Sequence, residues 1–168
     1  MPQARHPFWR YSLRTYRRPG VEAACLALQE RCGADVNLLL FCGWIGQAGR
    51  TIDRRRLQQA MARVGAWQAE VIQPLRQARR VIKHHPPQGL APELAQQLRR
   101  RLAAVEIELE HIEHCLLADL ASLWPPPRRV RAPPQAVATN LARYLSLLPA
   151  PAQPEDLRHV AVLAANFG

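Results

Sequence analysis

The chain has 168 residues, a length that suits one domain, and 48% of them are hydrophobic, which excludes a globally disordered protein. Its 23 basic and 13 acidic residues give a formal net charge of +10, and Lys83 is the only lysine among the basic residues. This charge favours acidic proteins, nucleic acid or other anionic surfaces as partners. GC-rich codons can produce the same arginine excess, and the sequence does not separate the two causes.

Nothing in the sequence predicts export or membrane insertion. The most apolar run, 36–45, is far too short to span a bilayer. Arginines interrupt the N-terminal region, so it lacks the apolar segment of a signal peptide. We therefore expect a cytoplasmic protein that does not enter a membrane. The four cysteines form no CxxC pair, and we expect them to be reduced and buried: Cys25, Cys32, Cys42 and Cys115.

Helix start and stop signals alternate along residues 7–50. They predict helices from Pro7 to before Pro19, from about Val21 to Cys32, and from the N-cap Asp35 through Trp44. The third of these helices is apolar nearly all round. We therefore expect it at the centre of the domain.

A long helical hairpin is predicted over residues 51–124. Apolar residues recur at intervals of three, four and seven from Leu57 to Ile82, and Pro74 predicts a kink near Gln73. The sequence HHPPQGLAP then breaks the pattern. A second stripe predicts a helix from about Glu93 to Leu123, with these residues on its inward face: Leu94, Leu98, Leu102, Val105, Leu109, Ile112, Leu116, Leu120 and Leu123. The two helices should run antiparallel.

The last part of the chain consists of a proline- and arginine-rich linker, 125–134, and further helices in 135–168. These helices should cover about 135–148 and 155–166, and no stretch alternates as a β-strand does. The sequence therefore predicts an all-α fold. We expect a single-domain helical bundle with a long antiparallel helical hairpin, covering residues 1–168.

Basic residues gather near the predicted turn of the hairpin. A turn near Pro87 places seven of them opposite one another: Arg76, Arg79, Arg80, Lys83, Arg99, Arg100 and Arg101. The same register sets Glu106, Glu110 and Glu113 opposite the Arg54–Arg63 region. Only the end of the hairpin far from the turn should therefore have its basic residues paired with acids. The basic end is either a site for an anionic partner or a solvated arginine-rich face. No base-stacking aromatics accompany it, which argues against sequence-specific RNA recognition.

A glutamate and histidine cluster in the second hairpin helix is the one candidate metal or acid–base site. Glu108 and His111 are three residues apart, a spacing used in di-iron bundles, and Glu110 and His114 are four apart. A second Glu-x-x-His motif is missing, and such residues also form ion-pair ladders on helix surfaces. There is no nucleophile elbow, no Walker loop and no GxGxxG motif. We therefore expect no cofactor and no catalytic residues.

Three stretches carry a resemblance to a known family: FWRYSLRTYRRPGVEAACLALQERCGADVNLLLFCGWIG, then WQAEVIQPLRQARRVIK, and later TNLARYL. With these stretches the chain resembles a small, mostly proteobacterial family of uncharacterised helical proteins, defined by a domain of unknown function. The resemblance is most distinctive from Pro19 to Trp44 and covers the chain through about Lys83. It implies a cytoplasmic, helical bacterial protein and supplies no activity or site residues.

Three functional hypotheses follow from these observations. In the first, the chain is a non-enzymatic binding or adaptor protein that docks an acidic protein or an RNA backbone through the basic end of the hairpin. In the second, it is a metal-binding or enzymatic bundle that uses the glutamate and histidine cluster. In the third, it is a structural protein that forms homo-oligomers through its helices.

Overall fold

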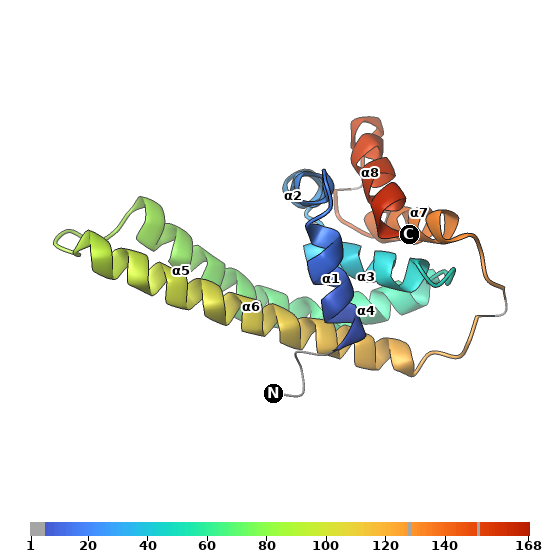
Figure 1. Cartoon of the computed structure of the whole chain (residues 1–168), viewed down its shortest axis with the longest axis horizontal. Coiled ribbons are helices and arrows are strands. Elements are labelled where there is room, and N and C mark those ends of the chain that lie inside the picture. Colours follow the sequence, from blue (N-terminus) through green and yellow to red (C-terminus); the bar gives the residue numbers. More distant parts are fainter. Residues whose placement is uncertain (1–5, 128, 151) are drawn as a thin grey trace.

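The computed structural model describes residues 6–127, 129–150 and 152–168, and within these ranges no strand occurs. The helices are α1 (Pro7–Tyr16), α2 (Val21–Cys32), α3 (Val36–Gly46), α4 (Arg54–Trp67), the π-helix η2 (Gln68–Ile72), α5 (Gln73–His84), α6 (Pro92–Ser122), α7 (Pro133–Leu145), the 3-10 turn η3 (Pro154–Asp156) and α8 (Leu157–Phe167) (Figure 1). The predicted all-α, single-domain fold is confirmed. No helix in the described part of the chain has the length and apolar character needed to cross a bilayer.

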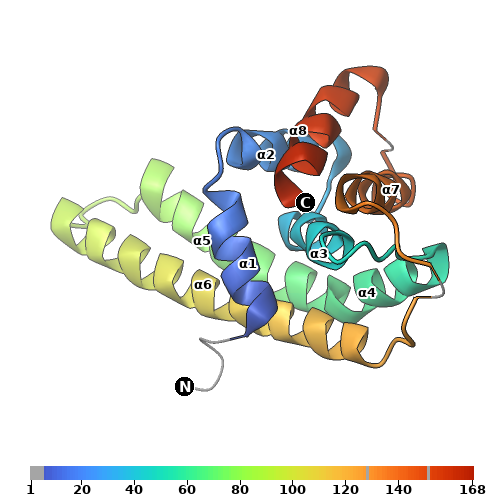
Figure 2. The same ribbon diagram turned by 45° about the vertical axis from the view of Figure 1, so that its right-hand side comes forward.

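Helix α3 lies at the centre of the molecule, as its sequence predicts (Figure 2). Asp35 caps its first turn by accepting a hydrogen bond from the Asn37 N–H at 2.8 Å. The helix packs against α1, α2, α6, α7 and α8, so nearly every side of it is covered. Leu39 and Phe41 have no exposed surface at all. Its continuous apolar sequence is what allows a helix to be buried on all sides.

Two glycines of α3 allow neighbouring helices to approach closely. A Cβ atom at Gly43 would lie 2.3 Å from the ring of Phe167 in α8, and one at Gly46 would lie 2.6 Å from Val137 in α7. Real Cβ atoms do not come so close to their neighbours, so a larger residue would force these helices apart. The absent side chains therefore set the distance of α7 and α8 from the central helix.

A long projection extends from one side of this core. Helix α4, η2 and α5 follow one another as a continuous rod, and the 31-residue α6 runs beside it (Figure 1). No residue of α5 is buried, and the first buried residue of α6 is Glu106. We call residues 73–105 the arm and the remaining described residues the head.

The predicted disturbance near Pro74 takes the form of a π-helical turn. The five residues of η2 end immediately before α5, in which Pro74 is the second residue. Proline has no N–H to donate and clashes with the carbonyl four residues earlier in an α-helix. The wider π-turn relieves this conflict, and it also places Gln68 beside the start of α3.

The cysteines largely follow their prediction. All four are free thiols; three are buried, and Cys115 is half-buried. Burial raises the pKa of the Cys25 thiol to about 12, which keeps this sulfur protonated and unreactive.

Candidate functional site

Two of the seven predicted anion-binding residues form ion pairs with glutamates of α6. Arg79 makes two hydrogen bonds to Glu106, Nε to Oε1 at 2.6 Å and Nη2 to Oε2 at 3.1 Å. Arg76 also pairs with an acid of α6, through a single hydrogen bond from Nη2 to Glu110 Oε1. The expectation that Arg76 and Arg79 carry uncompensated charge is therefore wrong. So is the expectation that Glu106 and Glu110 face the Arg54–Arg63 region.

The geometry of the connecting loop explains this error. The loop after α5 runs outward before α6 begins, so α6 starts farther from the head than α5 ends (Figure 1). A turn centred on Pro87 assumes that α5 and α6 extend equally far from the head. Because α6 reaches farther, α5 lies beside a later part of α6, and its arginines meet Glu106 and Glu110.

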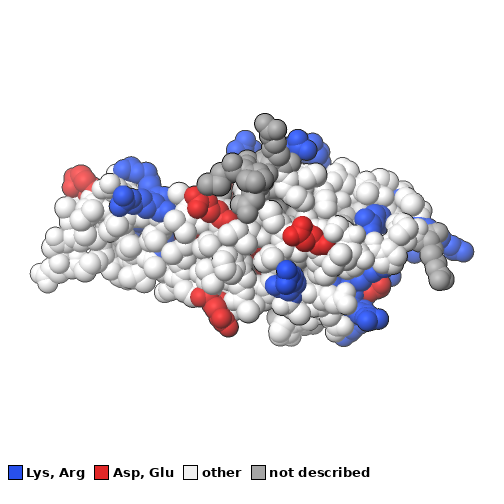
Figure 3. Space-filling view, turned by 90° about the horizontal axis from the view of Figure 1, so that it is seen from below, with Lys and Arg blue, Asp and Glu red and all other residues white. Residues whose placement is uncertain are grey.

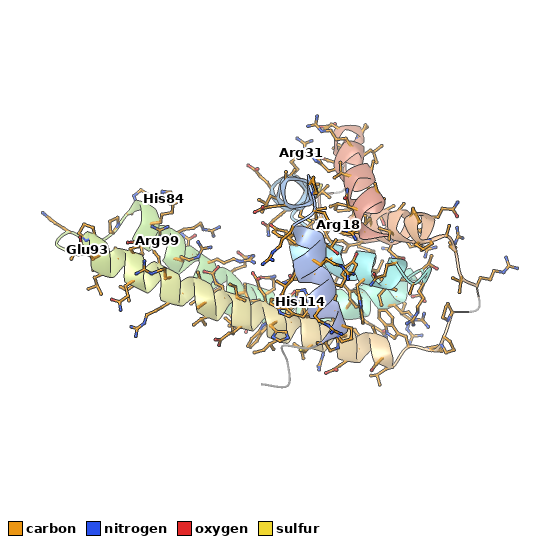
Figure 4. The ribbon with its side chains drawn as sticks, viewed as in Figure 1. Arg18, Arg31, His84, Glu93, Arg99 and His114 are labelled. Atoms are coloured by element: carbon orange, nitrogen blue, oxygen red, sulfur yellow. The ribbon has the colours of Figure 1, made fainter. Side chains whose placement is uncertain are left out.

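The other five predicted residues form no ion pair within the described chain: Arg80, Lys83, Arg99, Arg100 and Arg101. Arg80 donates only to the amide oxygen of Gln77, at 3.0 Å. Arg99 is half-buried, and its Nε has no hydrogen-bond partner. Arg99 lies toward the outer part of the arm, with His84 nearby and Glu93 closer to the tip (Figure 4).

Apolar side chains accompany this charge on the arm. Val81, Leu94 and Val105 are each more than 40% exposed, although all three belong to the predicted inward stripes or lie beside them. A basic group stands near the outer end of the arm, and much of the remaining visible surface is uncharged (Figure 3). The arm therefore combines unpaired basic residues with apolar surface.

The four residues of the glutamate and histidine cluster do not converge. Glu108 is exposed, and Glu110 forms an ion pair with Arg76 of the arm. His111 stacks on Trp9 with ring centroids 4.6 Å apart. His114 points into the head and is 1% exposed. In the ranges that the structure describes, no three His, Cys, Asp or Glu side chains are placed to hold a metal ion.

A cleft with a volume of about 740 Å³ lies where the arm joins the head. Its walls come from α1, α2, the start of α3, η2, α5 and α6. The polar residues that line it are Ser12, Arg17, Gln29, Asp35, Asn37, Gln68, Gln73, Arg76, Arg79, Arg80, Glu106, Glu110 and His114. Trp9 and Tyr16 add aromatic surface, and burial raises the pKa of Tyr16 to about 12.

One wall of the cleft holds a serine–histidine pair that sequence reasoning missed. The Nδ1 of His114 lies 2.8 Å from the carbonyl oxygen of Glu110, so Nδ1 carries the proton. Its Nε2 then accepts from the Ser12 hydroxyl at 2.9 Å. Burial lowers the pKa of His114 to about 4, which keeps the ring neutral. Because Ser12 is in the middle of α1, the neighbouring N–H groups serve the helix and provide no oxyanion hole.

A second polar network lies in the head, where α6 and η2 meet the start of α3. Glu113 has no exposed surface, and its Oε2 accepts from the side-chain amide of Asn37 at 3.0 Å and from that of Gln68 at 3.4 Å. The Gln68 amide also donates to Asp35 Oδ2 at 2.9 Å. Burial, followed by the nearby charge of Asp35, raises the pKa of Glu113 far above its usual range. A protonated carboxyl group therefore joins α3, η2 and α6.

Comparison with known proteins gives a family and no activity. No curated protein matches this chain, and no solved structure does. The family model described as "Protein of unknown function (DUF2390)" matches residues 7–117, a stretch that runs from α1 into the second half of α6 and contains both polar networks and the arm. This match covers more than half of the sequence and confirms the resemblance to an uncharacterised family, so the chain belongs to the DUF2390 family.

Proposed function

We propose that this protein is a non-enzymatic binding or adaptor protein whose arm docks an acidic, amphipathic segment of a partner protein. The observation that carries the proposal is the composition of the arm. Five basic residues without ion pairs share it with exposed apolar side chains, and α5 has no buried residue. A helix that presents acidic and apolar residues on neighbouring faces complements such a surface.

A protein partner suits the arm better than RNA does. Residues 73–105 contain no phenylalanine, tyrosine or tryptophan, so bases would have no aromatic ring on which to stack. Exposed side chains such as Val81 and Leu94 gain nothing from a phosphate backbone. They gain from burial against apolar side chains of a protein, at about 25 cal/mol per Å² of apolar surface.

The cleft extends the proposed surface toward the head. Arg80 belongs to the arm and also lines the cleft, together with Arg17 of the segment that follows α1. A partner segment lying along α5 would therefore meet further cationic and amide groups at its inner end. The free cysteines suit the reducing cytoplasm, and we place the interaction there.

A defined peptide tests the proposal. A fluorescent 20-residue helix built from glutamate and leucine, with about three to four apolar residues per two turns, should bind the purified protein in an anisotropy titration. The double variant Arg80→Glu, Arg100→Glu should weaken binding at least tenfold, since each charge-assisted contact contributes about 1.5–3 kcal/mol. Circular dichroism should show unchanged helix content, because both residues are exposed.

A matched control changes the same charge elsewhere. The variant Arg63→Glu, Arg158→Glu also replaces two exposed arginines, both outside the arm, and should bind the peptide normally. Equal weakening in both variants would mean that only the net charge matters. Binding of single-stranded RNA, but not of the acidic helix, would overturn the protein-docking proposal in favour of RNA.

A further inference from the structure

A second basic surface lies at the end of the head opposite the arm. Here the linker before α7 passes the start of α4 (Figure 1). A hollow of about 680 Å³ opens between them. The described residues that line it are Thr51, Asp53, Arg56, Pro127, Arg129, Val130, Arg131 and Arg143. We propose that this hollow binds a small compound that carries two or more phosphate groups.

A buried asparagine of α7 holds the loop before α4, which contributes Thr51 to the lining of the hollow. Asn140 has no exposed surface; its Oδ1 accepts from the N–H of Ile52 at 2.7 Å, and its Nδ2 donates to the carbonyl of Arg50 at 3.0 Å. Arg143, one turn later, donates from Nη1 to the carbonyl of Ile52 at 2.9 Å. The loop before α4 and one lining arginine are therefore held in place without a ligand.

A backbone contact fixes the linker side of the hollow. The N–H of Arg131 donates to the carbonyl of Gly49 at 2.9 Å. Gly49 has a φ of +70°, and a Cβ atom there would lie 2.4 Å from a methyl carbon of Val130 and 2.5 Å from the carbonyl oxygen of Arg131. Only glycine allows the linker to lie this close, which keeps Arg129 and Arg131 beside the start of α4.

The charges around the hollow are poorly balanced. Four of its described lining residues are arginines, and Asp53 is the one acid among them. Asp53 already caps α4 through the N–H of Arg56 at 2.8 Å and lies 3.6 Å from the Nε of the same residue. Arg54 and Arg55 add two more positive charges at the positive end of the α4 dipole. Like charges gathered in this way repel one another unless an anion lies between them.

A compound with several phosphate groups fits this arrangement in charge, geometry and size. The planar guanidinium group donates two parallel hydrogen bonds to phosphate oxygens. The positive charge of these arginines exceeds the negative charge of one phosphate group, so a ligand with several phosphate groups balances it better. The volume lies within the range of about 300–1,000 Å³ that is typical of small-molecule sites. Trp124, the nearby aromatic, lies under Arg56 at 5.5 Å and packs on Phe41, so it is not free to stack on nucleic-acid bases.

Pyrophosphate serves as the probe. Isothermal titration calorimetry at moderate salt should show one pyrophosphate bound per chain, and weaker binding of orthophosphate. The variant Arg129→Gln, Arg131→Gln should lose at least tenfold in affinity. Both side chains are exposed, so the variant should fold normally. The variant Arg80→Gln, Arg100→Gln removes the same charge from the arm and should bind pyrophosphate as the unmodified protein does.

Three results would overturn the site. They are an absence of pyrophosphate binding, equal weakening in the two variants, and binding of a single-stranded RNA in place of pyrophosphate. The inference does not depend on the proposed function, because the two surfaces share no residue. The Arg129→Gln, Arg131→Gln protein should still bind the acidic helix, so the failure of one proposal leaves the other standing.

Discussion

The head and the arm use helices of similar length in opposite ways. Nine of the eleven residues of α3 are buried, whereas none of the twelve residues of α5 is. Helix α3 is held by apolar contacts with five neighbouring helices; α5 packs mainly on α6 and adds two ion pairs to it. Stability should therefore concentrate in the head, and local opening should be easiest in the arm. The arm has little buried surface, so most of its side chains remain accessible to the proposed partner.

The largest expected effect on stability comes from removing a large side chain from the core of the head. Phe8 has no exposed surface and lies against Phe41, Trp44 and His114, with ring centroids 4.3–5.7 Å away. Phe8→Ala should lower the free energy of unfolding by about 3–5 kcal/mol, because it removes a large buried ring and leaves a cavity. Urea unfolding followed by circular dichroism measures this change.

The matched arm variant sharpens the comparison. Leu94 is 44% exposed, so Leu94→Ala should cost less than about 1 kcal/mol. Similar losses in the two variants would show that the arm is packed as firmly as the head, and the comparison would fail.

The polar network around Glu113 in the head should give a strong pH effect. The pKa of Glu113 is raised in the folded state, so above about pH 4.3 the unfolded chain is ionised while the folded chain keeps its proton. The folded state then binds more protons, and the free energy of unfolding falls as the pH rises toward the folded pKa. Glu113→Gln removes this proton, keeps the shape of the side chain, and should flatten that slope.

Urea midpoints at about pH 6 and about pH 8 check this prediction. At the higher pH the Glu113→Gln variant should be more stable than the unmodified protein by at least about 1 kcal/mol. His114 has the opposite sign: its pKa is lowered to about 4, so its contribution is lost as the pH falls below about 6.5. The variant should keep this acid-side loss. A parallel pH profile in the two proteins would mean that Glu113 is ionised in the folded state.

The sequence predicts the head well because the head follows simple rules. The N-cap Asp35, the glycine after α2 and the continuous apolar run of α3 each act locally, and the structure places all three helices of this region within a few residues of their predicted bounds. Gly43 and Gly46 of the same run allow close packing, since a Cβ atom at either position would clash with a neighbouring helix. Local signals suffice where every side of a helix is buried.

The arm and the polar networks depend on information that is not local. The leucine stripe predicts Val105, Leu109 and Ile112 on the inward face of α6, whereas the structure buries Glu106 and Glu113. The buried face is rotated by about one residue, because α6 packs against both the rod and the head. In the sequence, the seven-residue spacing from Glu106 to Glu113 indicates that these two glutamates share one face of α6. It does not indicate that this face is the buried one.

The smallest expected effect concerns the ion pair at the inner end of the arm. Glu106 is 6% exposed and Arg79 is half-buried, and two hydrogen bonds join them. A double-mutant cycle with Arg79→Gln and Glu106→Gln should give a coupling free energy of about 1 kcal/mol. This value exceeds that of a fully exposed pair because the Glu106 side chain is almost completely buried. Arg80→Gln should change the free energy of unfolding by less than about 0.5 kcal/mol, because that side chain pairs with no acid. A coupling near zero would mean that α5 is held to α6 by its apolar stripe alone. The contrast between a firmly packed head and a loosely held arm would then be even greater than the ion pairs indicate.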